Sequence, residues 1–217
     1  MMTVAILGGT GQQGRGLAQR FARAGAPVVV GSRDPERGRA AVAGWESTGS
    51  ITVATNAAAV EQSDVAVLAV PFDSVDRLLE ELRPRFKPGM VLIDVTVPVT
   101  FTAGKMAMVE VVEGSASEHV RARLPDGVLL AGAFKTVPAH LLGDAGAALD
   151  CDEFVCGDSD ESRRRAMQLV ELLPGLRPVD VGPLSRARSI EHLTALAIAI
   201  NRRHKIHDAR FRIVGLE

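Results

Sequence analysis

The sequence predicts an α/β fold with a mainly parallel sheet, and three observations support this fold class. Short apolar runs rich in β-branched residues recur along the chain, and their lack of alternating polar residues is typical of strands buried on both faces of a sheet. Segments with recognisable helix starts and ends separate these runs. Hydrophobic residues make up 47% of the 217 residues and charged residues 24%, which is enough for a sizeable core in one α/β domain.

Five apolar runs are predicted to form buried strands, at residues 4–7, 28–30, 65–70, 91–95 and 128–133. The helices between them show capping signals. Asp34 and Pro35 provide an N-cap and a first-turn proline for a helix that ends near Trp45. Ser115 and Glu118 have the spacing of a capping box. The alternation of strands and helices predicts parallel strands joined by right-handed crossovers.

The last third of the chain has a different pattern. Asp158 with Glu161 begins a helix that stops near Pro174, and short strands are expected around residues 154–155 and near Val179. A long helix is predicted from about residue 185 to residue 203. Its apolar side is formed, at helical spacing, by Ile190, Leu193, Ala197 and Ile200. No repeat, low-complexity tract or linker interrupts the sequence, so residues 1–217 are expected to form one unit.

A glycine-rich turn follows directly after the first predicted strand. Gly9, Gly11 and Gly14 fit the pattern G-x-G-x-x-G. Gly9 makes the tight turn, Gly11 lets the backbone approach a pyrophosphate, and Gly14 allows the next helix to pack closely. The N-terminus of that helix directs free N–H groups and partial positive charge at phosphates. Structural turns also collect glycine, but the strand before and the helix after favour a Rossmann-type, doubly wound dinucleotide-binding fold.

The end of the second predicted strand indicates which dinucleotide is bound. A site specific for NAD has an Asp or Glu here, but this chain has Ser32 and Arg33. Arg33 attracts a 2′-phosphate with a forked guanidinium, and Arg37, one helical turn further on, adds a second positive charge. These residues favour NADP over NAD. The alternative is that Arg33 faces solvent and pairs with Asp34.

The composition excludes several function classes. Lys and Arg number 25 and Asp and Glu 26, so the net charge of −1 lacks the basic footprint of nucleic-acid or anionic-membrane binding. The absence of Tyr excludes reductase mechanisms in which a tyrosine phenol donates a proton. The sequence shows no signal-peptide pattern and no apolar run of the roughly 18 residues that a membrane helix needs. With only two cysteines, these features predict a cytoplasmic protein that binds small molecules.

The remaining candidates for chemistry have simpler structural interpretations. His204 and His207 could share a helical face as metal ligands, but matching ligands are scarce nearby and a basic exposed tail fits better. Cys151 and Cys156 point to opposite faces if their segment is extended, which disfavours a disulfide and a shared metal. The three arginines at 163–165 are expected to form a solvated helix face. No metal site and no catalytic side chain are predicted.

Four segments resemble the NADPH-dependent reductases of coenzyme F420, the 8-hydroxy-5-deazaflavin:NADPH oxidoreductases. They read AILGGTG at 5–11, VGSR at 30–33, VCGD at 155–158 and GLRPVDVGPLS at 175–185. The first two are shared with other NADP-binding Rossmann proteins, and the last two are more specific. The resemblance implies reversible hydride transfer between C4 of the nicotinamide of NADP(H) and C5 of the deazaflavin. Residues 1–100 would then bind NADP(H), and residues 101–217 would complete the sheet and cover the deazaflavin.

The resemblance also implies roles for individual residues. Those that hold the pyrophosphate are Thr10, Gly11, Gln12 and Gln13. Those that hold the 2′-phosphate are Ser32, Arg33 and Arg37. Those that line the nicotinamide and the stacked rings are Val70, Ser74, Val97 and Ala139. Some members have a His that contacts the deazaflavin where this chain has Lys135, and the ammonium of Lys135 can still donate to a pyrimidine-ring oxygen.

Two other functions stay open on the sequence alone. Lys135 in place of His favours an NADP-dependent reductase of another acceptor, such as a flavin, a ferric chelate or a small carbonyl compound. A module that senses NADP without turnover would carry the same glycine turn. Hydride transfer between two bound cofactors needs correct distance, orientation and exclusion of water, but no protein nucleophile or general base. The near-zero net charge and the apolar final helix predict a homodimer.

Overall fold

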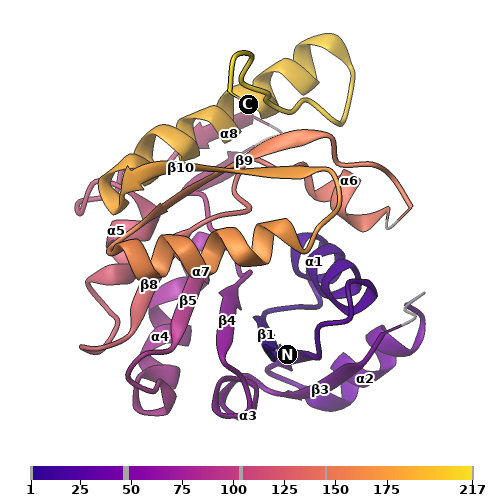
Figure 1. Cartoon of the computed structure of the whole chain (residues 1–217), viewed down its shortest axis with the longest axis vertical. Coiled ribbons are helices and arrows are strands. Elements are labelled where there is room, and N and C mark those ends of the chain that lie inside the picture. Colours follow the sequence, from indigo (N-terminus) through magenta and orange to yellow (C-terminus); the bar gives the residue numbers. More distant parts are fainter. Residues whose placement is uncertain (1, 46–48, 103–104, 145, 217) are drawn as a thin grey trace.

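A computed structural model shows an eight-stranded sheet between two layers of helices (Figure 1). It describes residues 2–45, 49–102, 105–144 and 146–216. All neighbouring strands are parallel except β8 and β9, which pair antiparallel through two residue pairs. The predicted α/β fold with a mainly parallel sheet is therefore confirmed. In spatial order the strands are β10 (Leu176–Pro183), β9 (Cys151–Gly157), β8 (Leu129–Gly132), β5 (Val91–Asp94), β4 (Val65–Leu68), β1 (Val4–Leu7), β2 (Val28–Ser32) and β3 (Ile51–Thr55).

The strand order reverses at β1, which lies between β2 and β4. From β1 the chain proceeds outward through β2 to β3, and then returns to the other side of β1 to form β4 and β5. In open parallel sheets, the crevice at the carboxyl ends of the strands beside such a reversal is the usual ligand site. The reversal therefore places the crevice between the ends of β1 and β4.

Each face of the sheet has its own hydrophobic core because successive strand residues point to opposite faces. Val4 and Ile6 belong to one core, and Ala5 and Leu7 belong to the other. The first core is covered by α1 (Gln12–Arg23), α6 (Ala139–Gly143) and α7 (Asp160–Glu171). The second is covered by α3 (Asn56–Glu61), α4 (Val75–Leu82), α5 (Ala116–Arg121) and the start of α8 (Ala187–His204). Figure 1 shows α7 in front of the strands and α8 across the top of the molecule.

The helix caps largely match the capping signals in the sequence. The Asp34 carboxylate accepts from the backbone N–H groups of Glu36 and Arg37, both at 3.1 Å, at the start of α2 (Pro35–Ala43). Ser115 caps α5 by accepting from the Glu118 N–H at 3.1 Å. The predicted start of α7 is wrong by one residue, because Ser159 is the N-cap.

The side chain of Asp158 is used elsewhere, which explains that difference. Its Oδ2 atom accepts from the Leu130 N–H and from Arg121, each at 3.0 Å, and so ties β8 and α5 to the start of α7.

Arg15, the residue of α1 that follows Gly14 of the glycine turn, contacts the side chain of Trp45. The Arg15 guanidinium lies 5.8 Å from the centroid of the Trp45 ring, beyond the end of α2.

Two features were not expected from the sequence. The edge strand β3 has an alternating pattern instead of a continuous apolar run, and β6 (Val99–Thr102) pairs with β7 (Lys105–Met108) in an antiparallel hairpin outside the main sheet. The predicted opposite orientation of the two cysteines is confirmed, since Cys151 belongs to the first core and Cys156 to the second. Within the described residues, no helix is long and apolar enough to cross a membrane.

Candidate functional site

The glycine turn lies at the carboxyl end of β1, beside the end of β4. Gly8 has a φ of +71°, and a Cβ atom there would lie 2.4 Å from Cγ1 of Val70. Val70 is therefore placed against the turn, at the end of β4. A Cβ on Gly14 would lie 2.8 Å from the Cα of Gly9, so the lack of a side chain allows α1 to pack closely on the turn. Gly14 thus has the packing role that its position in the motif predicts.

Gly11 differs because protein atoms do not fill the space where its side chain would be. Among the described residues, the carbonyl oxygen of Gly8 is the one atom within 4 Å of that position, at 3.6 Å. Gly11 is the N-cap of α1, and both Gly11 and Gln12 are exposed. The first N–H groups of a helix have no acceptor within the helix. The open space beside these N–H groups and the positive end of the helix fits a pyrophosphate.

Gln13 contributes differently from its neighbours in the turn. Its side-chain Nε2 donates a 2.5 Å hydrogen bond to the backbone oxygen of Phe134, which follows β8. Its backbone N–H, in the first turn of α1, is separate from this contact. The glycine turn and the segment after β8 are therefore joined directly, although they are 121 residues apart in the sequence.

The three residues expected at the 2′-phosphate lie together at the end of β2 and the start of α2. Ser32 is half-buried, and its hydroxyl donates to the Asp34 carbonyl oxygen at 2.8 Å. Arg33 and Arg37 are exposed, and neither forms an ion pair with another described residue. The alternative pairing of Arg33 with Asp34 does not occur, because the Asp34 carboxylate caps α2 instead.

The other residues expected around the rings also lie beyond the carboxyl ends of strands. Ser74 is exposed in a short 3₁₀ helix (Phe72–Ser74) after β4, and Val97 is half-buried after β5. Ala139 is half-buried and is the first residue of α6, in the segment that follows β8. Because β4, β5 and β8 are adjacent and parallel, these segments emerge at the same edge of the sheet as the glycine turn.

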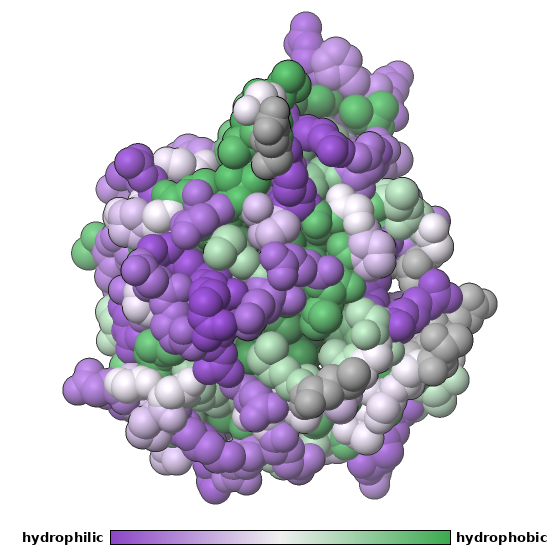
Figure 2. Space-filling model, viewed as in Figure 1, coloured by the Kyte–Doolittle hydropathy of each residue, from purple (hydrophilic) through white to green (hydrophobic). Residues whose placement is uncertain are grey.

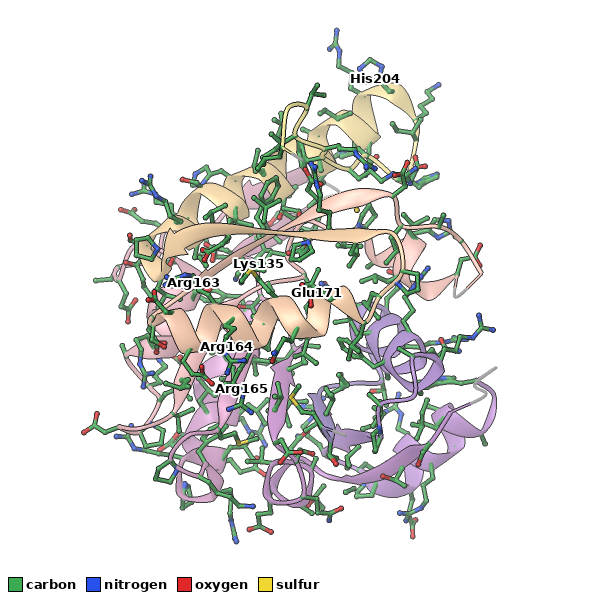
Figure 3. All side chains as sticks on the ribbon, viewed as in Figure 1. Lys135, Arg163, Arg164, Arg165, Glu171 and His204 are labelled. Atoms are coloured by element: carbon green, nitrogen blue, oxygen red, sulfur yellow. The ribbon has the colours of Figure 1, made fainter. Side chains whose placement is uncertain are left out.

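Lys135 is enclosed in the protein instead of facing the crevice. Its side chain is 0% exposed, and its Nζ atom donates to Asp94 at 2.7 Å, to Glu191 at 3.1 Å and to the Thr96 carbonyl oxygen at 2.5 Å. An ammonium has three N–H groups, so these contacts use its full donor capacity. This corrects the expectation that Lys135 presents a donor to the deazaflavin. Figure 3 shows Lys135 in the interior, between β10 and α7 in projection.

The buried ion cluster of Lys135, Asp94 and Glu191 joins three elements. Asp94 ends β5, Lys135 follows β8, and Glu191 lies on α8, where it also accepts from the Ala116 N–H at the start of α5 at 3.1 Å. Burial lowers the pKa of Lys135, but the two carboxylates outweigh this effect and hold that pKa above its ordinary value. Burial and the charge of Asp94 raise the pKa of Glu191.

Another buried carboxyl group, that of Glu153 on β9, supports the backbone turn at Phe134. Phe134 has a φ of +57°, a left-handed conformation that costs a non-glycine residue about 1–2 kcal/mol. Glu153 is 0% exposed, accepts from the Thr136 hydroxyl at 3.2 Å, and lies close to the N–H groups of Phe134 and Lys135. Its Oε1 atom has no hydrogen-bond partner among the described residues. Burial raises the pKa of Glu153 from 4.5 to about 8.

Sequence reasoning missed Asp94, Glu153 and Glu191. Asp94 interrupts the apolar run at 91–95, whereas Glu153 and Glu191 have other polar residues beside them. Charged residues are almost never fully buried unless they are paired. A charge within an apolar run is therefore a signal for Asp94, and no comparable local signal marks Glu153 or Glu191.

Comparison with known proteins identifies the family. Residues 3–98 match the family described as NADP oxidoreductase coenzyme F420-dependent. The F420-dependent NADP reductase of Methanothermobacter marburgensis is 38% identical over 224 residues, which cover 99% of both chains. The chain belongs to the F420-dependent NADP reductase family. The reductase of that name from Methanocaldococcus jannaschii is 31% identical and covers 100% of both chains.

Solved structures agree with the fold of this reductase family. A structure described as a putative F420-dependent NADP reductase from an Arthrobacter species has a TM-score of 0.83, with 24% identity over 99% of this chain and 100% of that chain. More distant similarity extends to the metalloreductase STEAP3 of Rattus norvegicus, which is 28% identical over 190 residues. That match covers 87% of this chain but 35% of the metalloreductase.

The other candidate groups of the sequence have structural partners or lie at the surface. Arg163, Arg164 and Arg165 lie along α7 (Figure 3), and Arg164 pairs with Glu161 at 2.6 Å. Figure 2 shows the hydrophilic surface over this helix. Burial raises the pKa of the Cys151 thiol to about 12, so this thiol is not a nucleophile near neutral pH. Within the described residues, no group of three or more His, Cys, Asp or Glu side chains could hold a metal ion.

Proposed function

We propose that the protein transfers a hydride in either direction between NADP(H) and the deazaflavin coenzyme F420. The observation that carries the proposal is the full-length similarity to F420-dependent NADP reductases. The open space at Gly11 beside the start of α1 supports it, because it fits the pyrophosphate of a dinucleotide. When bound, the two cofactors supply the reacting carbon atoms, and the protein binds, orients and shields them.

The glycine turn and the end of β2 bind the NADP(H) phosphates in this proposal. Thr10, Gly11, Gln12 and the backbone of Gln13 receive the pyrophosphate at the positive end of α1. Arg33 and Arg37 receive the 2′-phosphate, and support comes from their exposure and their lack of ion pairs with described residues. Ser32 helps to hold this segment through its hydrogen bond to the backbone of Asp34.

Residues 1–100 form the NADP(H)-binding core of a single unit in this proposal, and residues 101–217 complete the sheet and cover the deazaflavin. The rings would meet among the side chains of Val70, Ser74, Val97 and Ala139, which follow three adjacent strands at one edge of the sheet. For Lys135, the buried contacts support a positioning role: the residue anchors the segment after β8 to Asp94 and Glu191.

A direct assay tests the function. Purified protein is mixed with NADPH and oxidised F420, and the absorbance of the deazaflavin is followed. We expect bleaching faster than the uncatalysed rate, and a weaker reaction with NADH in place of NADPH. A rate equal to the uncatalysed one would contradict the proposal.

Replacement of Arg33 tests the role of the 2′-phosphate. Loss of a charge-assisted hydrogen bond of about 1.5–3 kcal/mol corresponds to roughly a 10- to 150-fold change in affinity. Arg33→Ala is therefore expected to raise the KM for NADPH by about that factor and to leave the KM for F420 unchanged. Arg39→Ala is the matched control, because Arg39 is exposed on the same helix. Equal changes in both KM values would argue against this role.

A second candidate function is reduction of another acceptor with NADPH. The similarity to a metalloreductase favours a ferric chelate in this role. Assays with ferric chelates, flavins and small carbonyl compounds distinguish the two candidates by the acceptor that gives the highest kcat/KM. Tight NADPH binding without oxidation by any acceptor would instead indicate a module that senses NADP.

We also propose that the reductase acts as a cytoplasmic homodimer. Support for the dimer comes from large apolar side chains at the surface, with Phe101 of β6 62% exposed and Leu196 of α8 49% exposed. Met106 of β7 and Ala199 of α8 line a common groove, so the hairpin lies beside this part of α8. Support for the cytoplasmic location comes from the cysteines, because the chain has two and both are buried and free of disulfides.

A further inference from the structure

The turn at Phe134 contacts the proposed phosphate-binding region and is connected through the chain to Ala139 of the proposed ring-binding region. On one side, Gln13 of the glycine turn donates from its Nε2 atom to the Phe134 carbonyl oxygen at 2.5 Å. The Phe134 ring packs edge-on against Phe21 of α1, with ring centroids 5.8 Å apart. The first turn and the last turn of α1 therefore both contact the same residue.

The other side of the turn is fixed to the sheet. Glu153 of β9 accepts from the Thr136 hydroxyl at 3.2 Å and lies close to the N–H groups of Phe134 and Lys135. The Lys135 ammonium is held by Asp94 at 2.7 Å. A left-handed φ at a residue other than glycine persists only where the surroundings hold it. With these contacts fixed, the Gln13 hydrogen bond links the turn directly to the phosphate-binding residues, while Arg20, further along α1, donates to the carbonyl oxygens of Leu141 and Leu142 of α6 at 2.9 and 3.1 Å.

The segment that leaves this turn leads into the other cofactor region. Residues 136–139 connect Phe134 to α6, and Ala139 is among the residues proposed to line the stacked rings. Thr136 and Val137 are buried, and buried side chains are closely packed. A shift of the Phe134 turn would therefore move residues 136–139 together. The position of Ala139 therefore depends on the conformation of the Phe134 turn together with the contacts of Arg20 to α6.

We propose that the Gln13–Phe134 hydrogen bond couples the two cofactor sites, so that occupation of the phosphate site increases the affinity for F420. Phosphates bound at the N–H groups of the first turn of α1 fix the backbone of Gln13, and its side chain then holds the Phe134 turn and residues 136–139 in place. Binding free energies are reciprocal, so F420 increases the affinity for the phosphate ligand by the same factor. Gln13 is a positioning residue in this scheme, and the inference rests on the proposed function.

A ligand without a nicotinamide ring separates this coupling from direct contact between the rings. The ligand 2′-phospho-ADP-ribose carries the pyrophosphate and the 2′-phosphate and cannot stack on the deazaflavin through a nicotinamide. The Kd for oxidised F420 is measured by its fluorescence, with and without saturating 2′-phospho-ADP-ribose. We expect the ligand to lower this Kd by about 2- to 12-fold, the factor that one hydrogen bond supplies.

Two variants with the same chemical change show whether Gln13 carries the effect. Gln13→Met removes the donor and keeps the length of the side chain, and we expect the ratio of the two Kd values to fall to about 1. Gln168→Met makes the same change at an exposed residue of α7 that is not among the proposed cofactor-binding residues, and we expect the ratio of the unchanged protein. A thermal unfolding midpoint within the range of the Gln168→Met variant shows that Gln13→Met is folded.

The possible results are distinguishable from a failure of the proposed function. If F420 binds to the unchanged protein and 2′-phospho-ADP-ribose leaves its Kd unaltered, the coupling is wrong and the function stands. The coupling is also wrong if Gln13→Met keeps the full ratio of Kd values. If F420 neither binds nor is reduced, the proposed function and this inference both fail.

Discussion

A carboxyl group enclosed in the interior makes the stability of this reductase depend on pH. Glu153 has a pKa of about 8 in the folded protein, against 4.5 for the ordinary group. Between pH 4.5 and about pH 8, the Glu153 carboxyl of the folded protein therefore keeps a proton that the unfolded chain has already released. Stability contributed by this proton is present below about pH 4.5 and is lost as the pH rises toward 8. Each pH unit within the interval costs about 1.4 kcal/mol from this group alone.

We expect Glu153→Gln to remove this dependence, because an amide does not titrate and can still accept a hydrogen bond from Thr136. The measurement is the free energy of unfolding in urea at pH values from 5 to 8. The unchanged protein should lose more stability across the interval than the variant does. Glu171→Gln is the control, because Glu171 is exposed at the end of α7 and should leave the slope unchanged. Parallel curves for the unchanged protein and Glu153→Gln would contradict the prediction.

Single residues could be predicted from the sequence where their roles are local. The Asp34 cap and Gly14 follow from residues a few positions away, and the structure shows both. The contacts of Lys135 with Asp94 and Glu191 span 41 and 56 residues, so no local pattern contains them. The sequence therefore gives Lys135 a role only through the family resemblance, and its burial is visible only in the folded structure.

At the scale of elements, the buried ion cluster attaches α8 to the sheet. Lys135 lies between a carboxylate on β5 and one on α8, and its side chain is 0% exposed. Removing one member of a buried ion pair usually costs about 3–5 kcal/mol, because the remaining charge is left without a partner. That cost is a large fraction of the roughly 5–15 kcal/mol by which native proteins are stable. This cation adds to the attachment of α8 that the buried Ala187 and Ile190 provide.

Lys135→Met is expected to lower the free energy of unfolding by about 3–5 kcal/mol, since it leaves Asp94 and Glu191 buried beside each other without a cation. Thermal and urea unfolding measure the change. The matched control is Arg164→Met, which breaks an exposed pair with Glu161 and should cost at most about 1 kcal/mol. A loss for Lys135→Met as small as that of the control would show that the cluster does not stabilise the fold.

The central strands could be predicted because they are buried on both faces and appear as continuous apolar runs. β3 could not, since it lies at the edge of the sheet beside β2 and its residues are partly buried or exposed. The hairpin of β6 and β7 lies outside the main sheet, and its described side chains are partly buried or exposed. Apolar sequence patterns therefore identify elements by how deeply they are buried.

At the scale of the whole molecule, the exposed apolar residues of the hairpin and α8 bear on the proposed homodimer. We expect sedimentation velocity to give a dimer for the unchanged protein and a monomer for Leu196→Glu, because a charge at a buried interface is costly. Gln168→Glu is the control, since Gln168 is exposed on the hydrophilic side of α7 and should keep the dimer. A monomeric unchanged protein, or a Leu196→Glu variant that remains dimeric, would contradict the prediction.

The fold could be predicted more completely than the site because hydrophobic periodicity is repeated in every element. The proposed phosphate site is also marked by a local motif at one helix start. The proposed ring site depends on three segments after β4, β5 and β8, which the sheet brings to one edge. Sequence alone could place these segments only through the family resemblance.

The contact between Arg15 and Trp45 has a practical consequence for all of these measurements. The chain has one Trp and no Tyr, so selective excitation of tryptophan observes a single position. That position lies beside α1, which begins at the phosphate-binding turn. Trp45 is therefore an intrinsic fluorescent probe, and its emission can follow the arrival of a nucleotide at this end of the protein without an attached dye.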